Sequence, residues 1–310
     1  AIILLGITSD GKPFRARDLG VGGAITVLMR DALSPNLVQT TEQTPAFIHG
    51  GPFANIAHGC SSVMATKMAM TFSDYVVTEA GFGADLGAEK FFNIKCRKAG
   101  LQPQLVVIVA TTQGLKMHGG VALDHIKEPN ADGLREGLKN LNRHINNMQG
   151  FGQPVIVTLN RFDSDTDEEI DIIRKNCEDR GVGFAVNEAF LKGGEGAVEL
   201  AQKVVDTIER IQPLPINFTY PQSETIEGKI EKVCKRIYGA AAVEFTKTGK
   251  KRLEAIREIF ADDKDISSYP ICIAKTQYSF SADATRYGSP EGFTIRILDV
   301  ILNCGSEMIV

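Results

Sequence analysis

The chain has 310 residues, of which 43% are hydrophobic and 23% are charged, and its formal net charge is −4. This is the composition of a globular protein with enough apolar residues for one large core or two smaller ones. The slightly acidic balance and the lack of a long basic block argue against a nucleic-acid or membrane partner. The one basic run, at residues 247–252, is interpreted as a solvated loop at the start of a helix.

The six cysteines are scattered without C-x-x-C spacing, which indicates reduced thiols rather than a disulfide framework or a zinc site. No segment is apolar for long enough to cross a bilayer. These features favour a cytoplasmic protein. The chain begins with Ala1 in what looks like the middle of a structural element, so we expect a processed chain or a piece of a longer one.

The first half of the chain predicts an α/β fold. Four apolar runs have the length and composition of strands covered on both faces: residues 46–49, 74–79, 104–111 and 154–160. Helical patterns lie between and after them, at residues 55–72, 131–149 and 165–181. This alternation predicts a doubly wound, mostly parallel sheet.

The pattern changes after about residue 210, where prolines interrupt the chain. Two further helices are expected there, at residues 226–240 and 249–262. A strand with a long polar loop is expected at residues 269–292, and strand-like apolar sequence at residues 293–310. We expect this part to form a second α/β unit.

The stretch YVVTEAGFGADLGAEKFF, residues 75–92, runs from an apolar segment through a glycine-rich turn into a helical pattern. The spacing Gly81-x-Gly83-x-x-x-Gly87 superficially resembles a dinucleotide-binding fingerprint. That fingerprint also needs an acid at the end of the next strand, where this chain has threonines. Asp85 would in addition repel a pyrophosphate. The pattern therefore argues against a nicotinamide or flavin site.

Two interpretations of the turn remain. Glu79, expected at the carboxyl end of a buried strand, is suited to order a magnesium ion, while the following glycines let the backbone approach an anion. Alternatively, the turn only joins a strand to a helix and leaves Glu79 and Asp85 exposed. The turn by itself leaves both interpretations open.

The loops after the other predicted strands carry more functional side chains than a connection needs. Because the carboxyl edge of an open α/β sheet is where ligands bind, we expect these loops to meet there. They carry His49, Asn55, His58, Lys116, His118, Asn160 and Asp163. From the turn and these loops, the charged candidates for catalysis are Glu79, Asp85, Lys116 and His118.

The loop after residues 154–160 suggests a nucleobase site. Asn160 can offer both of its amide groups to a base edge. Phe162 can lie against the ring, and Phe190, after the next structural unit, can cover the other face. The alternative is that both phenylalanines belong to the core.

Four of these stretches together resemble the formate–tetrahydrofolate ligase family, also called formyltetrahydrofolate synthetase: residues 44–62, 76–97, 109–120 and 159–166. The similarity runs through the whole chain, and residues 269–281 are similar to the third domain of that family. The resemblance implies an enzyme that uses ATP to join formate to N10 of tetrahydrofolate through formyl phosphate. It also implies a sheet of P-loop NTPase type, ATP with Mg, a monovalent cation and a homotetramer.

The resemblance also implies roles for individual residues. It assigns Phe162 and Phe190 to an aromatic sandwich around adenine, and Phe82 to the wall of the formyl phosphate pocket. Lys275 and Tyr278 are candidates for folate contacts, because they lie in the segment similar to the third domain. The role of Glu79 as a magnesium ligand is our own interpretation of the turn.

The resemblance also predicts how the chain is divided. Residues 1–22 are expected to be the remnant of a preceding domain, and residues 23–145 part of the nucleotide-binding domain. Residues 146–310 are expected to form a C-terminal α/β domain that contributes adenine and folate contacts.

The chain departs from the family pattern at three points. Relatives often have tryptophan in place of Phe190, and usually have arginine in place of Gln113. The phosphate-binding pattern G-x-x-x-x-G-K-[ST] does not occur in the sequence. We therefore expect this chain to be the middle and later part of the enzyme and to be inactive alone. The alternatives are a non-catalytic fragment or degenerate paralogue, and another carboxylate-activating ATPase of the same architecture.

Overall fold

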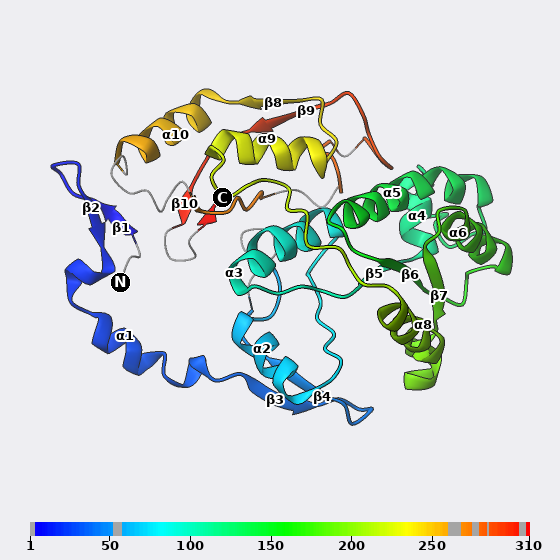
Figure 1. Cartoon of the computed structure of the whole chain (residues 1–310). Coiled ribbons are helices and arrows are strands. Elements are labelled where there is room, and N and C mark those ends of the chain that lie inside the picture. Colours follow the sequence, from blue (N-terminus) through cyan, green and yellow to red (C-terminus); the bar gives the residue numbers. More distant parts are fainter. Residues whose placement is uncertain (1–3, 52–57, 260–267, 275–278, 284, 304–307) are drawn as a thin grey trace.

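The computed structural model of the chain describes residues 4–51, 58–259, 268–274, 279–283, 285–303 and 308–310. It shows a mixed α/β protein in which the strands form several small sheets (Figure 1). The predicted α/β class is therefore confirmed, but the described residues do not form one large doubly wound sheet.

The largest sheet of the described part has three parallel strands in the order β5 (Val106–Ala110), β6 (Val155–Asn160) and β7 (Gly183–Asn187). β6 lies between two partners, and every residue of it except Asn160 is buried. This explains its apolar sequence without polar alternation. The prediction of strands at residues 104–111 and 154–160 is confirmed.

Helices pack around this sheet (Figure 1). The longest, α5, begins after Asn130, whose side-chain Oδ1 accepts a hydrogen bond from the Gly133 N–H at 2.8 Å. Its leucines recur at the helical period and are buried against the strands. The helices predicted at residues 131–149 and 165–181 are confirmed. The set around the sheet is α4 (Thr112–His118), α5 (Ala131–Gly150), α6 (Asp167–Asp179) and α8 (Val198–Arg210).

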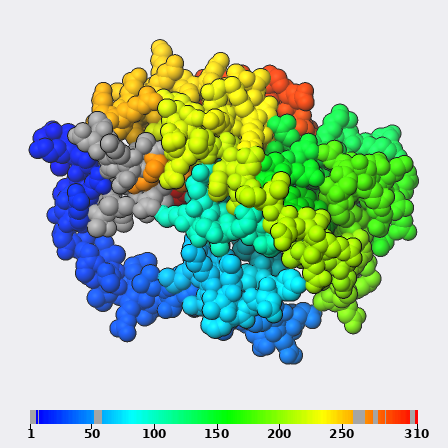
Figure 2. All heavy atoms as spheres, in the orientation of Figure 1, coloured from blue at the N-terminus to red at the C-terminus, as the bar shows by residue number. Residues whose placement is uncertain are grey.

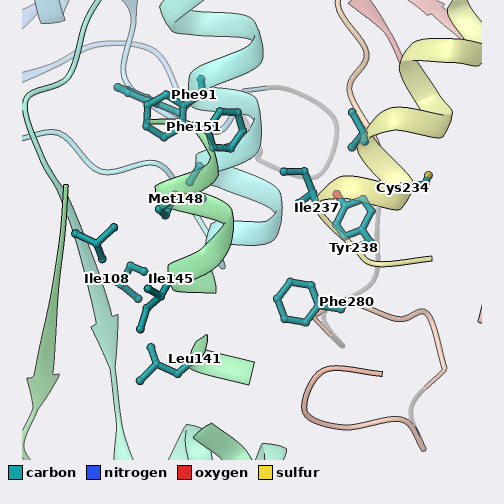
Figure 3. Close-up of a cluster of buried hydrophobic side chains, with 14 of the residues drawn as sticks. Phe91, Ile108, Leu141, Ile145, Met148, Phe151, Cys234, Ile237, Tyr238 and Phe280 are labelled. Atoms are coloured by element: carbon teal, nitrogen blue, oxygen red, sulfur yellow. The ribbon is translucent and has the colours of Figure 1, made fainter. Parts of the chain in front are cut away.

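The core extends from this sheet into the C-terminal part of the chain. In Figure 3, side chains of α5 and the residue after it lie between Phe91 and Ile108 on one side and the group around Tyr238 on the other. Ile145, Met148 and Phe151 are all fully buried. The predicted boundary at residue 145 also runs through the three-stranded sheet, because β5 precedes it and β6 and β7 follow it. The division into three domains stays a prediction.

The segment after the glycine-rich turn is helical, as its pattern predicts, but much of it is π-helical. It comprises η3 (Ala84–Ala88), η4 (Phe91–Cys96) and the short helix α3 (Arg97–Ala99). All residues from Asp85 to Cys96 are buried, including four charged ones. Because π-helical turns are rare and often mark functional positions, this segment is of interest for the site.

The N-terminal residues form an extended arm, defined here as residues 4–48. Figure 2 shows the arm curving away from the body, with an open gap between them. In the arm, β1 pairs with β2 and β3 pairs with β4, both antiparallel. The elements are β1 (Leu4–Ile7), β2 (Pro13–Arg15), η1 (Ala16–Leu19), α1 (Gly22–Leu28), η2 (Asp31–Leu33), β3 (Asn36–Gln39) and β4 (Pro45–Ile48).

Two strand predictions near the arm are wrong in part or in full. Residues 46–49 do include a strand, β4, but it pairs antiparallel with β3 and lies outside the parallel sheet. Residues 74–79 form no strand and follow the helix α2 (Val63–Phe72), which occupies the end of the predicted helix at residues 55–72. Val77 is 92% exposed, so the described residues leave this part of the apolar run uncovered.

The C-terminal part contains a second small parallel pair, β8 with β9, next to the predicted helices (Figure 1). Helices are confirmed within residues 226–240 and 249–262. The elements are α9 (Ile226–Arg236), β8 (Ala242–Phe245), α10 (Lys247–Ile259), β9 (Thr294–Ile297), β10 (Leu302–Asn303) and β11 (Met308–Ile309). None of the described helices has both the length and the apolar character of a membrane span.

Candidate active site

The carboxyl ends of β5, β6 and β7 define a rim, because the three strands are parallel and in register. Three segments leave the sheet at this rim: Thr111–His118 after β5, Asn160–Thr166 after β6 and Asn187–Ala197 after β7. The last of these contains α7 (Ala189–Lys192) and η5 (Gly193–Ala197). The predicted convergence of loops at one edge therefore holds for these three.

Asn160 and Asn187 are opposite each other at the ends of β6 and β7. The Asn187 Nδ2 donates to Asn160 Oδ1 at 2.9 Å, and the Ala189 N–H donates to Asn187 Oδ1 at 3.0 Å. The Asn160 carbonyl oxygen therefore already accepts one hydrogen bond, and it has a second lone pair. The expectation that both amide groups of Asn160 serve a nucleobase stays a prediction.

The two predicted stacking residues are solvent-accessible and lie on adjacent loops. Phe162 is 43% exposed and Phe190 is 95% exposed, which rules out the alternative that both are core residues. Their loops are joined by the Arg161 N–H, which donates to the Asn187 carbonyl at 3.1 Å. The Arg161 guanidinium also lies 3.6 Å from the Glu188 carboxylate. Both rings are thus available at the same rim.

The loop that carries Phe190 also meets the arm. The Gly194 N–H donates to Oε1 of Glu42 at 3.0 Å, and Glu42 lies in the turn between β3 and β4. A Cβ atom at Gly194 would come within 3.1 Å of the same carboxylate. The glycine therefore allows the close approach of the hairpin tip to this loop.

The glycine-rich turn presents Phe82 in a strained conformation. Phe82 has φ of 56°, a left-handed value that costs a non-glycine residue free energy, and its ring is 77% exposed. A Cβ atom on Gly87 would lie 1.7 Å from the Gly81 carbonyl oxygen, so the turn packs directly on the following helical segment. Strain that displays an apolar ring to solvent is a feature of binding sites. Among the described residues, no hydrogen bond or ring contact joins Phe82 to Phe162 or Phe190.

The acids of the turn are placed differently from each other. Glu79 is exposed, and its Oε2 accepts a hydrogen bond from the Gly81 N–H at 2.7 Å. It does not end a strand, which corrects that part of the prediction. Asp85 is only 3% exposed, so the expectation of two exposed acids holds for Glu79 alone.

Lys116 is buried, and its ammonium group contacts two other groups of the protein. Its Nζ lies 3.0 Å from Glu169 Oε1 and donates to the Glu128 carbonyl at 2.9 Å. Burial would raise the pKa of Glu169, but the Asn130 N–H, Lys116 and the Thr166 N–H outweigh it, so this pKa lies below its ordinary value. His118 is half-buried in the last turn of α4. The catalytic roles of Lys116 and His118 stay predictions, and the geometry gives Lys116 a structural task.

The histidines of the earlier loop lie away from the rim. His49 bonds through Nδ1 to the Ser62 hydroxyl at 2.7 Å and through Nε2 to the Ala32 carbonyl at 2.7 Å. Burial, together with nearby lysines, lowers the pKa of His58. Both follow β4, which belongs to a separate sheet, so their expected place at the same edge is wrong. Asn55, Lys275 and Tyr278 lie outside the described residues.

Several functional candidates escaped the sequence analysis. Asp165 and Thr112 are both buried and hydrogen-bonded to each other between two rim loops. Glu89 is fully buried, and burial raises its pKa to about 7 although its Oε1 accepts a hydrogen bond from Asn93 at 2.7 Å. Among the residues that were missed, the sequence pattern indicated a role only for Glu169. Thr166-x-x-Glu169 has the spacing of a capping box, which the structure forms at the start of α6.

Two further features of the described residues bear on ligands. No group of three or more His, Cys, Asp or Glu side chains in the described ranges is arranged to hold a metal ion. A cavity of about 310 Å³ lies at the opposite, amino-terminal edge of the sheet, with Gln149, Gln153 and Gly183 in its wall. It is remote from the rim side chains described above, so the rim residues remain the better candidates by their chemistry.

Comparisons with known proteins identify the family. The family model described as formate–tetrahydrofolate ligase matches residues 1–310. The chain belongs to this family. A formate–tetrahydrofolate ligase of Bacteroides fragilis is 62% identical over 308 residues, which cover 99% of this chain and 55% of that protein. The ligases of Bacteroides thetaiotaomicron and Porphyromonas gingivalis are 59% and 54% identical, with the same coverage.

Family membership confirms the resemblance drawn from the four sequence stretches. The chain spans about half the length of the curated relatives it matches.

Proposed function

We propose that this chain is part of an ATP-dependent ligase that joins formate to tetrahydrofolate, giving 10-formyltetrahydrofolate, ADP and phosphate through formyl phosphate. The observation that carries the proposal is the family match over residues 1–310, combined with two accessible phenylalanines on adjacent loops of one sheet rim. The proposal includes a cytoplasmic homotetramer, a P-loop NTPase type of fold and the three-domain division.

Phe162 and Phe190 form the proposed purine site. An aromatic ring with an open face can stack on a nucleobase, and each such contact stabilises binding by about 1–3 kcal/mol. The amide N–H₂ of Asn160 lies on the same rim and can donate to a ring nitrogen of the base. This donor then adds one directed hydrogen bond to the base, while the rings supply most of the affinity.

Phe82 forms the proposed wall of the site for the activated acid. Formate is a poor electrophile, and transfer of a phosphoryl group to it creates a leaving group. Such a reaction needs two reactants held in one orientation and water kept away from the intermediate. An exposed apolar ring held on a strained turn can shield one side of a small anhydride. Lys275 and Tyr278 are proposed to contact the folate.

Glu79 is the proposed protein ligand for the magnesium that accompanies ATP. Its Oε2 is engaged by the Gly81 N–H, so Oε1 is the oxygen offered to a cation. A single carboxylate oxygen fits this ion, because Mg²⁺ is commonly held by one or two carboxylates together with substrate phosphates and water. When bound, the ion would neutralise charge on the transferred phosphoryl group. No monovalent-cation ligand is proposed.

The purine site can be tested by calorimetric titration of the chain with ATP. Phe162→Ala is expected to weaken ATP binding by about 1–3 kcal/mol, or roughly 5- to 150-fold, because one stacking face is lost. The matched control is Phe72→Ala, which removes a phenylalanine that is 73% exposed on α2. It should leave the affinity unchanged. Equal ATP affinity in the parent and Phe162→Ala proteins would contradict the assignment, as would failure of the parent to bind ATP.

A further inference from the structure

The loop that displays Phe162 is closed by the carboxylate of Asp165. The Phe162 N–H donates to Asp165 Oδ2 at 2.9 Å, and the Asp165 N–H donates back to the Phe162 carbonyl at 3.0 Å. Asp165 is only 6% exposed, although the Phe162 side chain three residues earlier is 43% exposed. The buried Asp165 thus hydrogen-bonds to both the N–H and the carbonyl oxygen of Phe162.

The second oxygen of the same carboxylate is bound by a different loop. The Thr112 hydroxyl donates to Asp165 Oδ1. Thr112 is fully buried and is the first residue of α4, directly after β5. Asp165 therefore joins the segment that leaves β5 to the segment that leaves β6, and both of its oxygens have partners.

Asp165 is not needed to cap the following helix. The cap of α6 is Thr166, whose hydroxyl accepts from the Glu169 N–H at 3.2 Å, and Glu169 completes the capping box. A plain capping role would direct an Asp165 oxygen to the first turn of α6. Instead the carboxylate accepts hydrogen bonds from Phe162, in the loop after β6, and from Thr112, in the segment after β5.

We propose that Asp165, braced by Thr112, is a positioning residue that fixes the Phe162 ring at the rim for stacking on a purine. The proposal rests on the proposed function in so far as Phe162 binds the nucleotide. The side chain is 43% exposed, so packing covers only part of it, and its position also depends on the backbone of its turn. A turn fixed before binding lowers the entropy lost when the base stacks.

A buried ion pair braces the other end of the turn. Glu169 accepts the Asn130 N–H at 3.0 Å and pairs with Lys116 at 3.0 Å, while its Oε2 accepts from the Thr166 N–H at 3.3 Å. Thr166 directly follows Asp165, so the start of α6 cannot shift away from α4. Lys116 therefore helps to fix the position of this rim through its ion pair with Glu169.

The experiment compares ATP binding by the chain carrying Thr112→Val, Thr112→Ser or Asp165→Asn. Valine has the shape of threonine without the hydroxyl, and asparagine keeps only one carboxylate-like acceptor. Thr112→Val and Asp165→Asn should each raise the Kd for ATP by about three- to tenfold, which is the effect of one or two lost hydrogen bonds. Thr112→Ser keeps the donor and should bind ATP like the parent. Thermal unfolding of each protein identifies the fraction that is folded.

A double-mutant cycle separates positioning from general destabilisation. If Asp165 acts through the ring, then Thr112→Val in the Phe162→Ala background should cause no further loss of ATP affinity. NMR relaxation of ¹³C-labelled phenylalanine rings should show increased motion of Phe162 in Thr112→Val and not in Thr112→Ser. Additive losses in the cycle, or an unchanged Phe162 ring in Thr112→Val, would overturn the proposal.

The outcomes also distinguish the two proposals. Unchanged ATP affinity in Phe162→Ala would overturn the purine site alone, and the ring relaxation would still decide whether Asp165 and Thr112 fix the ring. A loss of affinity in Phe162→Ala with none in Thr112→Val or Asp165→Asn would overturn the positioning role alone.

Discussion

The N-terminal arm and the region around α5 use apolar residues to very different effect. In the region around α5, Leu134 and Ile145 are completely buried between the strands and the C-terminal part of the chain. In the arm, Val27 and Leu28 are 74% and 83% exposed, although they lie on a helix, α1, that is largely apolar. An apolar pattern stabilises a fold only where a second surface covers it. The arm therefore should contribute little to the free energy of unfolding of this chain.

The largest expected effect comes from breaking a buried ion pair in the α5 region. Lys116→Met removes the partner of Glu169, whose carboxylate is then left charged in the interior. Loss of one member of a buried pair costs about 3–5 kcal/mol of stability. Denaturant unfolding should show a lower midpoint for this variant.

The arm provides a matched control for that prediction. Lys12 lies 2.9 Å from Asp10, but both side chains are mostly exposed. Lys12→Met should leave the unfolding midpoint unchanged, because water screens an exposed pair. Similar losses for the two lysine variants would contradict the contrast between the regions.

The next effect comes from removing an apolar side chain in each region. Ile145→Ala leaves a cavity in the core of α5 and should lower the free energy of unfolding by about 2–5 kcal/mol. Val27→Ala changes an exposed side chain of the arm and should stay within about 0.5 kcal/mol of the parent. Urea unfolding measures both. A clear loss in Val27→Ala would show that the arm packs more tightly in solution than its exposure indicates.

The same contrast explains which elements the sequence could predict. α5 and β6 were predictable because their local pattern agrees with their surroundings: one face of α5 is covered, and both faces of β6 are. Residues 74–79 have strand composition but no partner strand within the described part of the chain. Strand pairing depends on distant residues that a local pattern does not contain. β4 has the same kind of composition and does form a strand. Because it pairs with β3, it lies in a different sheet from the one predicted.

The site follows the same rule. Asn160, Phe162 and Phe190 could be placed at a common rim because parallel strands present their carboxyl ends together. The partners of Lys116 could not be predicted, since Glu169 lies on a different helix, α6, and only the fold brings the two charges to 3.0 Å. The roles of Asp165 and Thr112 were hidden for the same reason. Residue type indicates which groups can react, but only the long-range contacts show which of them are already bound to another part of the protein.

The smallest expected effect depends on pH and concerns the buried carboxyl of Glu89. Its pKa in the folded protein is about 7 against an ordinary 4.5, mainly because burial disfavours the charged form. The folded state therefore holds this proton more tightly than the unfolded state. The contribution to stability is present in full below pH 4.5 and is lost as the pH rises through 7.

Glu89→Gln should remove this pH dependence, because glutamine keeps an oxygen for Asn93 but does not ionise. At pH 8 the variant should be more stable than the parent by about 1–3 kcal/mol, the value of the pKa difference less the cost of a new unpaired amide N–H. At pH 5 the advantage should vanish. Chemical unfolding at both pH values measures the difference, with Glu42→Gln at the exposed hairpin tip of the arm as the control. Parallel pH profiles for the parent and Glu89→Gln would mean that Glu89 keeps an ordinary pKa, and that water reaches this part of the core as freely as it reaches the arm.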